Sequence, residues 1–129
     1  MANPEALAML RIARRDLKAA QVLWDNAIDE AIWGFQIQQA VEKALKAWLL
    51  HLGEDPPLIH NLTALLERIA GAGADVSQFR CLEAFTIFAV QFRYDADPEP
   101  MGLDRGHWLQ RAEQLVEHVA LLIAAGPDG

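Results

Sequence analysis

Apolar residues recur at helical spacing along nearly the whole chain. The first such segment begins at Asn3-Pro4-Glu5, where Asn can cap a helix, Pro fits its first turn and Glu faces its positive end. Leucines and alanines then repeat every three or four residues until Asp25-Asn26 breaks the pattern. We therefore predict a first helix whose inward face consists of Ala6, Leu7, Leu10, Ala13, Leu17, Ala20 and Trp24.

Turn and capping residues divide the rest of the chain into four further helices. Asn26 and Asp29 resemble a weak capping box, which predicts a second helix from Asn26 to about Leu52. Pro56 and Pro57 cannot continue that helix. The other predicted helices span about 61–70, 77–92 and 104–124. The 77–92 helix is apolar nearly all round, so we expect it to be central.

This pattern predicts the fold class and the domain organisation. Five helices with short connections, and no useful period-two alternation, predict an all-α, up-and-down bundle of four to five helices. We expect residues 1–125 to form a single domain and 126–129 a loose tail. No apolar run reaches the ~20 residues that span a bilayer, and the N-terminal residues do not resemble a signal peptide. We therefore expect a cytoplasmic protein without membrane contact. The lone Cys81 is expected to be buried as a small apolar residue.

Charge is unevenly distributed along the chain, whose net charge is −7. Basic and acidic residues balance in residues 1–50, and the whole excess of acid lies in residues 51–129. An acidic protein has no general attraction for phosphate backbones, so a nucleic-acid contact would have to be local. The first helix offers one basic face, which is either solvated or a surface for RNA or a partner: Arg11, Arg14, Arg15 and Lys18.

The segment "FQIQQAVEKALKAWL" (35–49) carries polar residues where an amphipathic helix would place leucine. At ~100° per residue, Gln38 falls within the apolar arc and Glu42 at its edge. Gln36, Gln39, Lys43 and Lys46 form a narrow polar stripe that we expect to face solvent. Burying an unpaired carboxylate costs several kcal/mol, so Glu42 should have a cationic partner.

Two cations are candidates for that partner. Lys46 lies one turn further along the same helix, and Arg93 follows the predicted fourth helix. Arg93 is the better candidate, because a planar guanidinium can hold a carboxylate with two hydrogen bonds. Either this cluster is a structural network that fixes helix packing, or it is a polar site where the second helix meets the fourth helix and its loop.

Other side chains add few chemical possibilities. His60 or Asn61 can cap the third helix, or His60 can join Gln39, Lys43 and Arg93 in a pocket for phosphate or a nucleotide. Trp33 is either a core residue or part of a dimer interface. No Cys/His spacing indicates zinc and no Gly-rich phosphate loop is present, so we predict neither a metal nor a cofactor.

Three segments, taken together, resemble the HEPN (higher eukaryotes and prokaryotes nucleotide-binding) domain family. "FQIQQAVEKALKAWL" (35–49), "IHNLTALL" (59–66) and "AVQFRYD" (89–95) have the order and spacing of that family, and residues 14–34 resemble its opening. The resemblance implies a four- to five-helix bundle that usually forms a homodimer. Many members are paired with a small nucleotidyltransferase in toxin–antitoxin-type modules, and many others are metal-independent ribonucleases.

The chain departs from the ribonuclease members at one motif. Those members carry an arginine followed four to six residues later by a histidine, whereas the next histidine after Arg93 is His107, fourteen residues on. Metal-free RNA cleavage needs a group that moves a proton and a cation for the developing charge. Arg93 can supply the cation, with Tyr94 or His60 assisting, but Asp95 and Asp97 repel phosphate.

We therefore expect a non-catalytic or weakly catalytic HEPN protein that forms a homodimer and is the partner of a small nucleotidyltransferase, in a toxin–antitoxin-type or nucleotide-responsive module. The alternatives are a metal-independent ribonuclease that uses Arg93, and a module that binds a nucleotide, RNA or another polyanion. The candidates for catalysis are Arg93, Tyr94 and His60. The candidates for a ligand site or polar network are Gln38, Gln39, Glu42, Lys43, Lys46, His60, Arg93 and Asp95.

Overall fold

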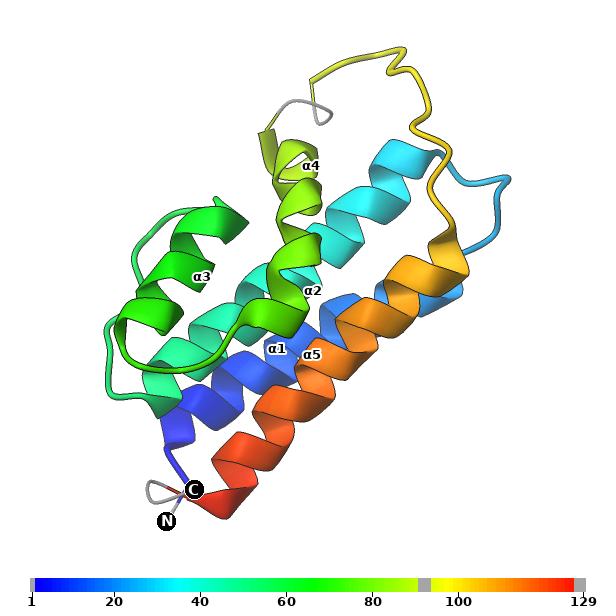
Figure 1. Ribbon diagram of the computed structural model, residues 1–129. Helices are drawn as coiled ribbons and strands as arrows, with labels where there is room; N and C mark the ends of the chain where they lie inside the picture. The colour runs from blue at the N-terminus through cyan, green and yellow to red at the C-terminus, as the bar shows by residue number, and fades with distance from the viewer. Residues whose placement is uncertain (1, 91–93, 127–129) are drawn as a thin grey trace.

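The chain is an all-α bundle in the computed structural model, which describes residues 2–90 and 94–126 (Figure 1). Within these residues there are helices but no strands, as the sequence predicts. The helices are α1 (Pro4–Val22), α2 (Glu30–His51), α3 (Leu62–Gly71), η1 (Ser77–Thr86, a 3-10 helix), α4 (Ile87–Val90) and α5 (Arg105–Ala125). The three long helices α1, α2 and α5 lie side by side, and the shorter elements pack on α2.

The predicted start of α1 is confirmed. The Asn3 side-chain oxygen accepts hydrogen bonds from the backbone nitrogens of Glu5 (2.9 Å) and Ala6 (3.3 Å). Its side-chain nitrogen donates to the carbonyl oxygen of Leu50, at 3.0 Å. One asparagine therefore caps α1 and also joins the start of α1 to the end of α2.

The central helix is α2, and the expectation that the 77–92 helix is central is wrong. In the described part of the chain, α2 alone packs against all the other helices. Most of its 22 residues are buried, including a row of alanines that permits close packing. Trp33, left open between core and dimer interface, is fully buried and donates from Nε1 to the carbonyl oxygen of Ala20.

The segment predicted as one α-helix from 77 to 92 is mostly a 3-10 helix. Its large apolar residues lie three positions apart, at Phe79, Leu82, Phe85 and Phe88, and all four are buried. A 3-10 helix has three residues per turn, so this spacing places all four on one line, whereas in an α-helix the line would drift. Among the described residues of this segment, 87–90 are α-helical, and residues 91 and 92 lie outside the described part of the chain.

Three expectations about single residues are wrong for local reasons. The second helix begins at Glu30 rather than Asn26, because Asp25 accepts a hydrogen bond from the Ala27 nitrogen (2.8 Å) and forms a turn there. Trp24 is 58% exposed, since α1 ends at Val22 and its periodicity stops with it. Cys81 is exposed because it lies off the buried line of η1.

The periodicity did not predict the role of Arg105, the first residue of α5. Its side chain is buried and donates to the carbonyl oxygens of Asp25 and Ile28, both at 2.7 Å. The guanidinium also lies 5.6 Å from the centre of the Trp33 ring, within cation–π range. Arg105 therefore attaches the α1–α2 connection to the start of α5.

The described helices include none with the length and apolarity needed to cross a membrane.

Gly34 marks the closest approach of α2 to α4, which leads to a test of the packing. A Cβ at Gly34 would lie 2.6 Å from the Phe88 ring, which is itself buried against Phe85. We expect Gly34→Ala to lower the free energy of unfolding by about 1–3 kcal/mol, because the Phe88 ring or the α2 backbone must shift from its packed position. Urea denaturation measures this loss.

Gly71→Ala is the matched control, since Gly71 is also helical but a Cβ added there would have no neighbouring atom within 4 Å. We expect it to leave stability unchanged or to raise it by up to about 1 kcal/mol. Equal stability of the Gly34→Ala variant and the wild-type protein would contradict the close approach.

Candidate functional site

The candidate site is a cluster of polar side chains around Glu42, which lies on α2 and is only 1% exposed. Gln38 Nε2 donates to Glu42 Oε1 at 2.9 Å, and His60 Nδ1 lies 2.9 Å from the same oxygen. Lys46 Nζ donates to Oε2 at 3.0 Å, and Lys43 Nζ lies 3.6 Å from it. Both carboxylate oxygens are therefore engaged by groups of the same chain.

Hydrogen bonds extend this cluster beyond the carboxylate. Gln38 Nε2 also donates to the carbonyl oxygen of His60 (3.1 Å), and its Oε1 accepts from Gln39 Nε2 (2.6 Å). Lys43 in turn donates to Gln39 Oε1 at 2.9 Å. Among the described residues, no buried side-chain nitrogen or oxygen lacks a partner. The buried polar atoms of this cluster, here called the Glu42 network, therefore all have partners. The network joins α2 to His60, the residue before the α3 cap.

Electrostatics keep Glu42 ionised. Burial raises the pKa of the Glu42 carboxyl, but hydrogen bonds from Gln38, His60 and Lys46, with the charge of Lys43, hold it below the ordinary value. The pKa of Asp16, on α1, is shifted in the opposite direction. Burial raises this pKa, and the nearby charges of Lys43 and Arg15 only partly oppose the rise. Glu42 is therefore an anion at neutral pH, and it serves as the counter-ion of the buried Lys46.

The expected polar stripe of α2 does not face solvent. Lys46 is 8% exposed, and Gln36, Gln39 and Lys43 are half-buried. The prediction failed because the ion pair with Glu42 draws the Lys46 side chain along the helix instead of outward. The pair of Glu42 with Lys46, the less favoured of the two candidates, is present. The pairing with Arg93 stays a prediction, since Arg93 lies outside the described residues.

His60 takes part in the network because its neighbour caps the helix. Asn61 Oδ1 accepts from the Ala64 nitrogen (3.1 Å) at the start of α3, so the His60 ring is left free to contact Glu42. The His60 side chain is nevertheless 62% exposed. A buried carboxylate therefore holds one nitrogen of a ring that is open to solvent, an arrangement that orients a histidine for proton transfer.

The remaining candidates lie in the loop after α4. Tyr94 is 81% exposed, and Asp95 is exposed with its Oδ1 accepting a hydrogen bond from the Asp97 nitrogen at 3.0 Å. Asp95 lines a hollow with Phe35 and Gln36, at the N-terminal half of α2. The structure thus brings together six of the predicted residues: Gln38, Gln39, Glu42, Lys43, Lys46 and His60.

Asp16 is a neighbour of the network that the sequence analysis missed. It lies close enough to Lys43 and Glu42 to share their electrostatic field. A signal was present, since Asp16 is the only acidic residue between Ala6 and Trp24, next to the basic positions of α1.

Neutralising Glu42 tests whether the network holds the fold together. Glu42→Gln leaves Lys46 buried without its counter-ion, so we expect the free energy of unfolding at neutral pH to fall by about 3 kcal/mol. Adding Lys46→Met should restore part of this loss, because the unpaired buried charge is removed. Chemical denaturation of both variants measures the two effects.

Glu67→Gln is the control, since it breaks an exposed ion pair with Arg80 (2.7 Å), and such a pair contributes little to the free energy of unfolding. The effect of Glu42→Gln should also depend on pH. Because the pKa of Glu42 is lower in the fold than its ordinary 4.5, its stabilisation is complete above about pH 4.5 and disappears as pH falls through the folded value. A difference between wild type and variant that persists unchanged at pH 3 would contradict this assignment.

Comparison with known protein families identifies the family of this chain. The family model described as the HEPN domain matches residues 6–125. Searches of curated proteins and of solved structures gave no significant match. The matched residues cover nearly the whole chain and include the Glu42 network together with all the helices named above, except the first two residues of α1. This chain belongs to the HEPN domain family.

Proposed function

We propose that this HEPN protein is a non-catalytic interaction protein of the cytoplasm. In this proposal it forms a homodimer and binds a small nucleotidyltransferase, in a toxin–antitoxin-type or nucleotide-responsive module. The observation that carries the proposal is the engagement of Lys43 and Lys46 by Glu42 inside the fold.

A site that cleaves RNA directs cations at the phosphate on which charge develops. The two lysines of α2 contact Glu42 and Gln39 instead, and Lys46 is almost inaccessible to solvent. The described loop residues 94–104 contain acidic side chains and no basic one, and His107 lies in the first turn of α5 rather than four to six residues after Arg93. These features favour binding over catalysis.

Charge supports a protein partner over a nucleic acid. The net charge of −7 arises entirely from residues 51–129. This excess of acidic residues repels phosphate backbones and attracts basic protein surfaces. The basic residues Arg11, Arg14, Arg15 and Lys18 are all exposed on α1, and they offer a separate, local surface of opposite charge.

The proposal is tested by purifying the protein alone and with the product of its neighbouring gene. We expect the protein alone to have the mass of a dimer in light scattering, and a stable complex to form when the neighbour is a nucleotidyltransferase. A nucleotidyltransferase from the neighbouring gene that elutes separately at micromolar concentration would refute the proposed partnership.

A metal-independent ribonuclease is the second candidate, and the Glu42–His60 contact is the observation that favours it. A buried anion that holds an exposed imidazole resembles the arrangement of a general base. Incubation with single-stranded and structured RNA, without metal, distinguishes the two functions. Under the first proposal no cleavage occurs, whereas cleavage that both His60→Ala and Arg93→Ala abolish would establish the second.

A further inference from the structure

We infer that a groove between the start of α2 and the loop after α4 binds a basic, extended segment of a partner protein. The groove, here called the loop groove, consists of two adjoining hollows that share Asp29, Ala31, Ala96 and Pro98. The inference deepens the proposed function and rests on it for the identity of the partner, but the recognition chemistry can be tested separately.

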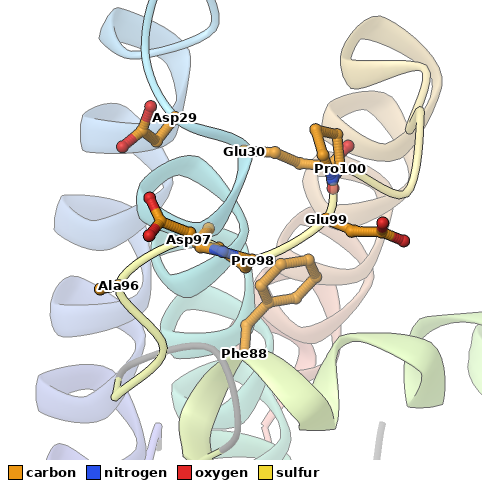
Figure 2. A pocket seen from close by; sticks show the side chains of 9 residues that line it. Asp29, Glu30, Phe88, Ala96, Asp97, Pro98, Glu99 and Pro100 are labelled. Atoms are coloured by element: carbon orange, nitrogen blue, oxygen red, sulfur yellow. The ribbon is translucent and has the colours of Figure 1, made fainter.

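The size of the two hollows suits side chains. Their volumes are ≈ 240 Å³ and ≈ 290 Å³. Both are below the ~300 Å³ at which sites for small molecules begin, so each holds a side chain better than a whole ligand. In Figure 2, the loop through Asp97, Pro98 and Glu99 passes between the start of α2 and the Phe88 ring of α4. Two adjacent hollows of this size match two side chains of one extended segment.

Apolar side chains form part of the walls of the loop groove, and acidic side chains line it as well. Phe88, Pro98 and Pro100 line the first hollow, and Ile32, which is 50% exposed, lines the second with Phe35. Four exposed acidic residues surround these walls: Asp29, Asp95, Asp97 and Glu99. No described residue that lines either hollow carries a positive charge.

This combination selects arginine or lysine side chains. Their aliphatic stems pack on apolar surface while their charged ends reach nearby carboxylates. A bare metal ion fits less well, because the acidic and other ligating side chains of the described residues form no group able to hold a metal. RNA is disfavoured because its phosphates meet the acidic side chains of the groove.

The loop groove is formed before a partner arrives. The Glu30 carboxylate accepts hydrogen bonds from the backbone nitrogens of Met101 (2.6 Å) and Leu103 (3.0 Å). These bonds hold the loop against the first turn of α2. Because this end of the loop is already held in place, a short segment can bind with less loss of conformational entropy.

A fluorescein-labelled peptide GRLRLRG is the probe, with GELELEG as its acidic counterpart, and anisotropy measures binding in 50 mM NaCl. We expect the basic peptide to bind and the acidic one not to bind. The variant Asp95→Asn/Asp97→Asn/Glu99→Gln should weaken binding about tenfold or more, because it removes the charges but keeps the hydrogen-bond acceptor of Asp95. Ile32→Ser should weaken binding several-fold by removing apolar wall.

The matched control is Glu54→Gln/Asp55→Asn/Glu117→Gln, which changes the net charge equally at exposed positions outside the groove. It should weaken binding less than about threefold, and thermal denaturation checks that all variants are folded. Equal losses in the two triple variants, or no binding of the basic peptide by the wild-type protein, would overturn the inference.

The same variants separate this inference from the proposed function. A nucleotidyltransferase that binds the groove variant as tightly as wild type would leave the proposed partnership intact and overturn the groove as its docking site. Peptide binding that requires the groove acids, in a protein that binds no nucleotidyltransferase, would support the groove and refute the proposed partner.

Discussion

The structure depends on one buried carboxylate. Glu42 lies on the helix that packs against all the other described helices, and an ionised carboxylate in that position requires partners. Gln38 and Lys46 come from the same helix, but His60 must be brought from the segment before α3. Satisfying Glu42 therefore determines where α3 begins relative to α2, which hydrophobic burial alone would leave adjustable.

The same network limits the chemistry that the protein can perform. Because Glu42 engages Lys43 and Lys46, the cations of α2 are not presented to a phosphate, and the exposed part of the cluster is the His60 ring. At the other half of α2, Glu30 uses its carboxylate to hold a loop rich in acids. The HEPN bundle thus combines a polar cluster whose carboxylate engages its own lysines with an acidic, partly apolar groove.

A structural feature could be predicted from the sequence when the residues that cause it are close neighbours in the chain. The caps at Asn3 and Asn61 were readable because each acts within one turn. The Glu42–Lys46 pair was also readable, since both residues lie on one helix. The 3-10 geometry of η1 had a signal in the spacing of its large apolar residues, but that signal was outweighed by their general helical pattern. Trp24 was misplaced because it lies beyond the last residue of α1, where the helical periodicity ends. Cys81 was misplaced because it lies off the buried line of η1.

The sequence by itself determined an all-α bundle, the approximate helices and the need of Glu42 for a cation, because these depend on periodicity, capping and the cost of a buried charge. The family resemblance came separately, from three sequence segments in the order and spacing of that family. Only the tertiary structure decided which groups meet across helices: His60 with Glu42, Arg105 with the α1–α2 connection, and Glu30 with the loop before α5. Each of these contacts joins residues that are distant in the chain. No local sequence pattern specifies how the backbones that carry them are placed relative to one another. The physical reason is that satisfying a buried polar group dictates that a partner exists, whereas the packing of the whole bundle dictates which residue it is.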